Sequence, residues 1–156
     1  MKNSITKEEM AFYREAFNEA QKGFREGGIP VGSVLVMDGK IIGRGHNQRF
    51  QHESAILHGE MDALEKAGRL TAAQYQQCTL YTTLSPCPMC SGAIALYKIP
   101  KVIVGENTNF LGEEAQLKAL GIEVVVLQDK ESIEMMSTFI QNSPELWNED
   151  IGVSEL

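Results

Sequence analysis

CTLYTTLSPCPMC, residues 78–90, joins an apolar, β-branched run to two cysteines that stand three residues apart. The run over 78–84 has the composition of a buried strand. Pro88 favours a helix that begins directly afterwards, because the first turn of a helix does not need its backbone N–H. This stretch therefore predicts a strand that leads into a helix, with Cys87 and Cys90 where the helix begins. Cysteine spacing alone leaves a disulfide, a redox pair and a metal site open.

The composition and charge of the chain restrict its class and its partners. The chain has 156 residues, 43% of them apolar, which predicts one globular domain over residues 1–156. Its net charge is −7, from 14 basic and 21 acidic residues. Such a chain repels a phosphate backbone unless a local basic patch compensates, and we find no such patch in the sequence. We therefore expect a small-molecule substrate and no nucleic-acid partner.

The sequence predicts neither export nor a membrane location. The first ten residues, MKNSITKEEM, lack the apolar core of a secretory signal, and no apolar run approaches the roughly eighteen residues of a membrane span. We therefore expect a cytoplasmic protein, in which thiols stay reduced. An odd count of three cysteines would also leave one unpaired. Both observations argue against a disulfide between Cys87 and Cys90.

The rest of the chain alternates between helix and strand patterns. Thr6 and Glu9 have the spacing of a capping box, and apolar residues follow at helical spacing as far as Phe24. Asp38-Gly39 separates two strand-like runs and predicts a hairpin. The other predicted elements are strands over 101–105 and 122–127, and helices from Pro88 to Lys98, over 113–120 and 131–141, and around 145–150. This order predicts a three-layer α/β/α domain with one mixed five-stranded sheet flanked by helices.

A further helix is predicted between the hairpin and the strand over 78–84. It should begin between Ser54 and His58 and end at Gly68, a residue type that suits a helix C-cap. Apolar residues at helical spacing predict its buried face, which consists of Leu57, Met61 and Leu64. This helix would carry His58 near its start.

A third metal ligand is available in HGE, residues 58–60. His58, Cys87 and Cys90 make a set of three protein ligands and leave a fourth tetrahedral position open, as in catalytic zinc sites. The start of a helix favours thiolates, because its dipole and its free N–H groups stabilise negative charge. Soft sulfur ligands argue against magnesium and calcium. The sequence therefore predicts one Zn²⁺ ion per chain.

Glu60 is predicted to act beside the metal rather than to bind it. A carboxylate that reaches over the open position can accept a proton from the attacking water and pass it to a substrate nitrogen. H-x-E followed by P-C-x-x-C is the known signature of zinc-dependent nucleobase deaminases, and this sequence matches it. Either motif alone is a weaker signal than the two together, each at the start of a predicted helix.

Other interpretations of these residues explain less. A redox pair at Cys87 and Cys90 would leave His58 without a role. A structural zinc site would need a further ligand, and Cys78, the remaining cysteine, lies inside a predicted strand, where it suits a small buried apolar residue. A zinc-binding interaction module without activity would not need Glu60.

Six segments resemble the fungal-type cytosine deaminases, which act on the free base. They are EGGIPVG, GRGHNQRFQ, LHGE, TLYTTLSPCPMCSGAI, VGENTNF and EDIG, and they agree in order and spacing from about Glu26 to Gly152. PCPMC occurs throughout the wider superfamily, so the resemblance rests on the combination. The hairpin at Asp38-Gly39 is short for the family. The resemblance implies a cytidine-deaminase-like fold, a homodimer, and the conversion of cytosine and water into uracil and ammonia.

The resemblance also implies a role for each site residue. His58, Cys87 and Cys90 would hold zinc, and Glu60 would move protons. The substrate-binding residues would be Asn47 and the Gly59 N–H at the carbonyl edge of the base, backbone groups of Leu84 and Ser85 at its amino group, Phe110 and Trp147 as an aromatic lid, and Asp150 at the ring N1–H. Without the resemblance, Asn47 would suit a turn, the two aromatic residues a core, and Asp150 a solvated surface. The alternative substrates are guanine or another free nucleobase, and an adenosine in tRNA, which the negative charge disfavours.

Overall fold

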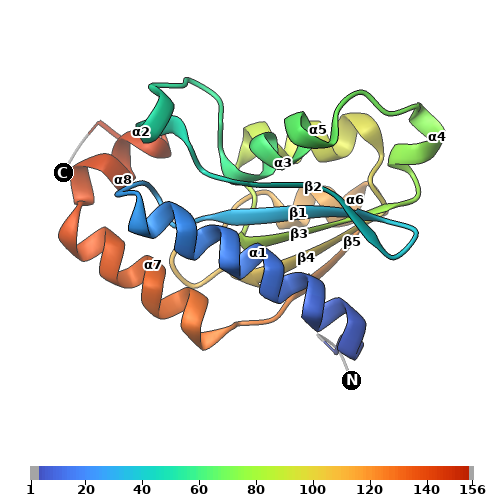
Figure 1. Ribbon diagram of the computed structural model, residues 1–156, viewed down its shortest axis with the longest axis horizontal. Helices are drawn as coiled ribbons and strands as arrows, with labels where there is room; N and C mark the ends of the chain where they lie inside the picture. Colours follow the sequence, from blue (N-terminus) through green and yellow to red (C-terminus); the bar gives the residue numbers. More distant parts are fainter. Residues whose placement is uncertain (1–3, 155–156) are drawn as a thin grey trace.

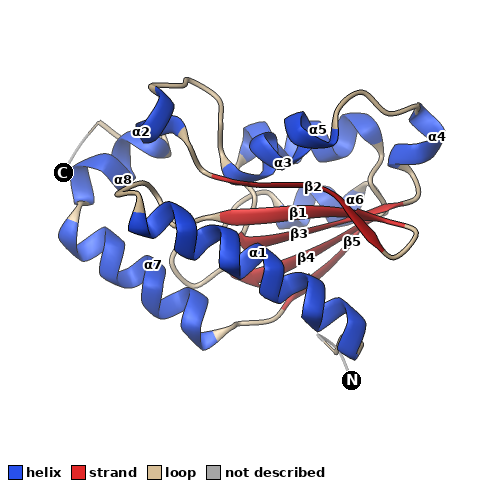
Figure 2. Cartoon of the chain, in the orientation of Figure 1, coloured by secondary structure: helices blue, strands red, loops and turns tan. Residues whose placement is uncertain are grey.

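The computed structural model describes residues 4–154, and these form one mixed sheet covered by helices on both faces (Figures 1 and 2). The strands are β1 (Gly32–Met37), β2 (Lys40–His46), β3 (Cys78–Leu84), β4 (Lys101–Glu106) and β5 (Glu123–Val126). The helices are α1 (Lys7–Arg25), α2 (Arg49–His52), α3 (Gly59–Ala67), α4 (Ala72–Tyr75), α5 (Pro88–Tyr97), α6 (Glu114–Ala119), α7 (Lys130–Asn142) and α8 (Pro144–Asp150). The predicted three-layer α/β/α architecture is confirmed.

The sheet has the strand order β2-β1-β3-β4-β5. β1 is antiparallel to both of its neighbours, whereas β3, β4 and β5 are parallel to one another. The predicted hairpin joins β1 to β2, and its turn residues Asp38 and Gly39 have φ angles of 52° and 73°. Positive φ at both positions matches the twist of the two strands. The parallel strands end at the same edge of the sheet, where the chain turns into loops and helix starts.

Alternation along the central strands creates two apolar cores. Leu35 and Leu80 face one core, in which α3, α4, α5 and α6 cover the sheet. Val34 and Tyr81, the adjacent residues on the same strands, face the other core, which α1 and α7 cover. Both faces of the sheet are therefore buried. Among the described residues, no helix is both long enough and apolar enough to span a membrane.

The first helix has the predicted start. The Thr6 hydroxyl accepts a hydrogen bond from Glu9 N, and the Glu9 carboxylate accepts one from Thr6 N, both at 3.0 Å. Tyr13 and Phe17 are buried on the inner face of α1, whereas Phe24 near its end is partly exposed. The capping box therefore fixes where this helix begins, and the apolar spacing fixes which side faces the sheet.

The predicted buried face of α3 is wrong. Its buried residues are Gly59, Glu60, Asp62 and Ala63, whereas Met61 and Leu64 are only partly buried and Leu57 precedes the helix. The cause is a close approach to β2. A Cβ atom added at Gly43 would lie 2.3 Å from Ala63 O, so the side of α3 that carries Ala63, rather than the side with Met61 and Leu64, lies against this strand. Gly68 caps the helix as predicted. The four-residue helices α2 and α4 were not predicted.

Candidate active site

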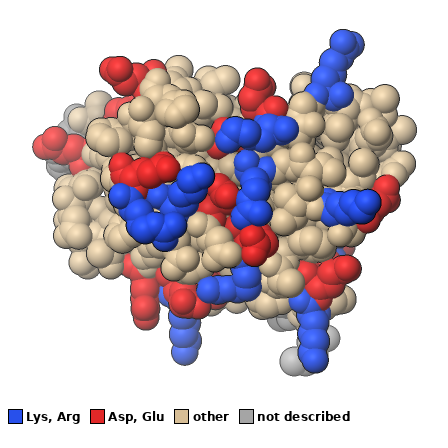
Figure 3. Space-filling model, in the orientation of Figure 1, with Lys and Arg blue, Asp and Glu red and all other residues tan. Residues whose placement is uncertain are grey.

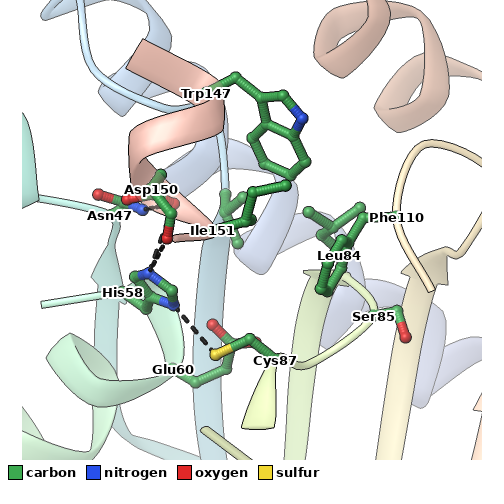
Figure 4. Close-up of a pocket in the computed structure, with 11 residues that line it drawn as sticks. Asn47, His58, Glu60, Leu84, Ser85, Cys87, Phe110, Trp147, Asp150 and Ile151 are labelled. Carbon is green, nitrogen blue, oxygen red and sulfur yellow. Dashed lines mark hydrogen bonds and ion pairs between the residues drawn. The ribbon is translucent and has the colours of Figure 1, made fainter. Parts of the chain in front are cut away.

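A cavity lies where β3 ends and where α3 and α5 begin (Figure 4). Its volume is about 20 Å³, so its walls lie close together in this structure. The residues that line it are Val31, Asn47, His58, Glu60, Leu84, Ser85, Cys87, Phe110, Trp147, Asp150 and Ile151. Segments that are distant in sequence meet at this edge of the sheet. They are Val31 before β1, Asn47 after β2, the starts of α3 and α5, the loop after β4, and α8.

Most of the predicted site residues line this cavity. Cys90 lies behind its wall and is fully buried, and Gly59 packs between His58 and the backbone of Val31, where an added Cβ atom would lie 2.9 Å from Val31 O. Val31 and Ile151 also line the cavity but were not predicted. An apolar side chain at the end of a strand or helix carries no chemical signal in the sequence, so they could not be singled out.

His58, Cys87 and Cys90 converge on one point, where they could hold a metal ion. His58 is the N-cap residue of α3, and Cys87 is the N-cap residue of α5. His58 Nδ1 lies 3.3 Å from Cys87 Sγ and 3.7 Å from Cys90 Sγ, and the three ligand atoms lie within 4.8 Å of one another. One imidazole nitrogen and two sulfurs form a donor set that suits zinc.

Cys87 and Cys90 have opposite pKa shifts. Their mutual hydrogen bond, followed by the hydrogen bond to His58, lowers the pKa of Cys87 to about 4, although burial opposes this. The bond to Cys87, together with burial, raises the pKa of Cys90 well above its usual value. Cys87 is therefore the more acidic of the two thiols. A metal bound at both sulfurs would release the protons that they still carry.

Asp150 fixes the orientation of the His58 ring. His58 Nε2 lies 3.2 Å from the backbone oxygen of Asp150 and 3.4 Å from its Oδ2 (Figure 4). Burial would lower the pKa of His58, but the bonds to Asp150 and Cys87 raise it to about 10. An acceptor at Nε2 leaves Nδ1 pointing at the sulfurs, which is how a second contact commonly aims a metal-binding imidazole.

The carboxylate of Asp150 is buried and charged. Only 8% of this residue is exposed, yet hydrogen bonds from His58, Arg49 and Asn47 outweigh burial and keep its pKa below the usual value. Asn47 Nδ2 donates to Asp150 Oδ2 at 3.0 Å. The cavity therefore presents a fixed negative charge beside an amide donor.

Glu60 is the buried acid of the site. It lies in the first turn of α3, two residues after His58, lines the cavity and is only 3% exposed. Burial and the charge of the nearby Cys87 sulfur raise its pKa to about 7. A carboxyl group with this placement can accept a proton and return it.

Aromatic and polar side chains complete the walls. Phe110, from the loop after β4, and Trp147, from α8, meet edge to face with ring centroids 6.0 Å apart. Ser85 is held in place, because its hydroxyl donates to Glu114 Oε2 at 2.6 Å and its backbone N–H donates to Glu106 O at 3.0 Å. Its N–H is therefore already paired, and a ligand would meet Ser85 at other atoms.

A His–Cys–Cys donor set beside a buried glutamate, at the helix starts of an α/β/α sandwich, defines the class of zinc-dependent deaminases. The model of the cytidine and deoxycytidylate deaminase zinc-binding region matches residues 6–106, which include these four residues. The chain belongs to this family. It is therefore a zinc-binding deaminase, and the donor set found here is the one that could hold the ion.

Known proteins similar to the chain act on different substrates. A cytosine deaminase from Candida albicans is 56% identical over 138 residues, which are 88% of this chain and 92% of that protein. A tRNA-specific adenosine deaminase from Streptococcus pyogenes serotype M18 is 44% identical over 115 residues, 72% of each chain. The X-ray structure of guanine deaminase from Bacillus subtilis is 33% identical with a TM-score of 0.53, over 73% of this chain and 70% of that one.

Proposed function

We propose that this protein is a cytosine deaminase that converts the free base and water into uracil and ammonia. The observation that carries the proposal is the composition of the cavity, which brings the metal-donor set, Glu60 and the buried Asp150 carboxylate together. The Candida albicans relative supports it, because the similarity extends over almost the full length of both chains.

Zinc would be held by His58, Cys87 and Cys90, and when bound it supplies Lewis acidity and lowers the pKa of water to about 7 in favourable sites. The remaining chemistry falls to Glu60. Its carboxylate accepts a proton from the attacking water and delivers it to ring nitrogen N3. After water adds to C4, Glu60 accepts the second proton from the new C4 hydroxyl group and passes it to the amine. The C4–N bond then breaks with loss of ammonia, and C4–O becomes the carbonyl of uracil.

Asn47 and Asp150 would recognise the carbonyl and N1 edge of the base. In the contacts of the described residues, the Asn47 amide uses one N–H on Asp150, which leaves its second N–H for the carbonyl oxygen of cytosine. The Gly59 N–H would donate to the same oxygen. Asp150 would accept the N1–H in a charge-assisted bond. A nucleoside carries a sugar at N1 and offers no such donor.

The other walls would enclose the ring and its amino group. Phe110 and Trp147 would stack over the base and exclude bulk water. The amino group needs acceptors, so Leu84 and Ser85 would meet it with backbone carbonyl oxygens, because the Ser85 N–H already donates to Glu106.

The charge of the chain favours a small substrate. The net charge is −7, and Figure 3 shows acidic side chains interspersed with basic ones on the face it presents, without one continuous basic surface. Binding to a nucleic acid depends on many contacts between basic side chains and phosphates.

Ultraviolet spectra of the zinc-loaded protein with cytosine, cytidine, adenine and guanine test the proposal. Cytosine should be converted into uracil with release of one ammonia per base, while cytidine stays unchanged. Conversion of guanine, adenine or cytidine with no action on cytosine would refute the proposed function and leave the deaminase family unaffected.

We also propose that residues 1–156 act as one domain and that two chains form a homodimer. Leu96 and Tyr97 are exposed on α5, next to the partly buried Met61 of α3, and these apolar side chains suit a contact with a second copy. Light scattering coupled to size exclusion should give the mass of two chains. The mass of one chain would refute the dimer.

A further inference from the structure

Arg49 lies behind the cavity wall and joins the segments that carry its polar residues. The arginine is in α2, and 16% of its side chain is exposed. Its Nε donates to Ala55 O at 2.9 Å, and its Nη1 donates to Asp150 Oδ1 at 3.1 Å. Nη1 and Nη2 also donate to the two carboxylate oxygens of Glu149, at 2.9 and 2.7 Å. One side chain therefore binds two consecutive residues of α8.

The same residue holds the two polar side chains that face the cavity. The Arg49 backbone N–H donates to Asn47 Oδ1 at 3.0 Å, so the amide of Asn47 must point its nitrogen towards the cavity and Asp150. The guanidinium binds Asp150 Oδ1, whereas Asn47 binds Oδ2. Both oxygens of the carboxylate are therefore fixed from opposite sides, and its plane cannot turn without breaking a bond.

α8 depends on such contacts because it is short. It has seven residues, and a helix of this length is not stable in isolation. Trp147 attaches one side of it to the apolar cluster around Ile29 and Met136. Arg49 provides a polar attachment on another side, where α2 lies beside α8 in Figure 1. Two parallel bonds between a guanidinium and a carboxylate are directional as well as strong.

We infer that Arg49 is a positioning residue, which aims Asp150 and Asn47 at the bound base and keeps α8 closed over the cavity. The identity of the base rests on the proposed function. The attachment of α8 does not, because it follows from contacts within the chain alone.

The first test is independent of activity. Trp147 is the single tryptophan of the chain, so quenching of its fluorescence by acrylamide reports how closely α8 is attached. In the zinc-loaded protein, Arg49→Gln should increase quenching. Arg44→Gln is the matched control, because Arg44 also binds two carboxylates, but these are Glu15 and Glu19 of α1 rather than residues of α8. Equal quenching in both variants would overturn the inference.

The second test separates positioning from loss of structure. Arg49→Gln should lower kcat/KM for cytosine by about 10²-fold, the effect expected when a reacting group is misplaced by about 1 Å. It should also reduce the ratio of kcat/KM for cytosine to kcat/KM for 1-methylcytosine, which lacks the N1–H. Arg44→Gln should leave that ratio unchanged. A loss of activity with an unchanged ratio would overturn the inference.

Two milder variants serve if Arg49→Gln fails to fold. Arg49→Lys keeps the charge without the fork of donors and should fall between the wild type and Arg49→Gln in both tests. Glu149→Gln keeps the contact between Arg49 and Asp150, so it should increase quenching with little effect on the substrate ratio. If the unmodified protein does not act on cytosine, the proposed function fails, and the quenching comparison still decides the role of Arg49.

Discussion

His58 and Glu60 are two residues apart but have different partners. His58 Nδ1 faces the sulfurs, whereas Glu60 is buried beside them and lines the cavity. We predict that Glu60→Gln binds zinc normally and loses activity, because an amide cannot accept the proton of the attacking water. The loss in kcat on cytosine should reach or exceed about 10²–10⁴-fold, the usual value of a general acid–base step.

Elemental analysis of the purified Glu60→Gln variant supplies the control, with one zinc expected per chain. Cys87→Ala should lose the metal in the same measurement. A Glu60→Gln protein with near-normal turnover, or one without zinc, would contradict the separation of the two roles.

Asp150→Asn removes the charge of this side chain and leaves its backbone contacts in place. Asp150→Asn preserves the backbone oxygen that lies 3.2 Å from His58 Nε2, so zinc content should stay normal. The variant loses the charged acceptor for the N1–H. A hydrogen bond to a charged group contributes about 1.5–3 kcal/mol, so kcat/KM for cytosine should fall about 10–10²-fold. Steady-state assays with cytosine and 1-methylcytosine measure this, and an unchanged preference for cytosine would contradict it.

The sequence signals at this scale were unequal. The H-x-E and P-C-x-x-C motifs indicate a zinc site by their residue types and spacing alone, and the structure brings His58, Cys87 and Cys90 together as they predict. Asp150 followed only from the resemblance to cytosine deaminases, because an aspartate near a chain end is usually solvated. Arg49 gave no signal, since its partner Glu149 lies 100 residues away and only the folded chain brings the two together.

At the scale of elements, the close contact of α3 with β2 positions two site residues. α3 begins at Gly59, with His58 as its N-cap and Glu60 in its first turn, and its Ala63 backbone lies against Gly43. Gly43→Ala should destabilise the fold by about 1–3 kcal/mol, the usual cost of overpacking, because the new methyl group meets the backbone of Ala63. Denaturant unfolding measures this, with Lys40→Ala at the exposed start of the same strand as control. Equal stability of the two variants would contradict the prediction.

A buried charge network stabilises the end of β2 next to Asn47. His46 is 3% exposed, and its two ring nitrogens lie 3.0 Å from Glu19 and 2.9 Å from Glu26. Burial would lower the pKa of His46, but these carboxylates raise it above its usual value. The hydrogen bond to His46, helped by Arg44 and opposed by burial, lowers the pKa of Glu19 to about 2.

These shifts give the network a definite pH dependence. The depressed pKa of Glu19 contributes stability above its usual value of 4.5, and this is lost as the pH falls towards 2. The raised pKa of His46 contributes stability that is complete below its usual value of 6.5 and is lost as the pH rises through the folded pKa. We predict that Glu19→Gln flattens the decline in melting temperature between pH 4.5 and 2, whereas Glu15→Gln, at a more exposed carboxylate, does not. Parallel acid declines in the wild type and Glu19→Gln would contradict this.

Local rules predicted the elements that depend on local chemistry. The capping box at Thr6 and the turn at Asp38-Gly39 need only neighbouring residues, and both formed as expected. The buried face of α3 was predicted wrongly because it depends on a residue in a different strand. Gly43 lets the backbone of Ala63 approach β2 closely, and this contact determines which side of the helix is buried. The four-residue helix α2 is held by tertiary contacts such as those of Arg49, so no local sequence pattern predicts it.

At the scale of the whole molecule, the cavity divides into two parts along the chain. The zinc-binding region of the family ends at residue 106 and includes the metal donors and Glu60. Phe110, Trp147, Asp150 and Ile151 come from beyond that region and close the opposite side. The metal donors therefore belong to what the family shares, whereas the aromatic lid and the proposed N1–H acceptor come from the part outside it.

This division predicts the effect of ending the chain after Leu146. The shortened protein loses Trp147 and Asp150 but keeps His58, Cys87 and Cys90, so it should still bind one zinc. Its affinity for the metal should fall about 10–100-fold, because His58 loses its second contact at Nε2. Activity on cytosine should disappear at saturating zinc, because the aromatic lid and the N1–H acceptor leave together. A chain that ends after Gly152 keeps α8 and is the control, with activity expected. Zinc titration and the cytosine assay on both proteins measure this, and substantial turnover without α8 would show that base recognition resides in the shared half.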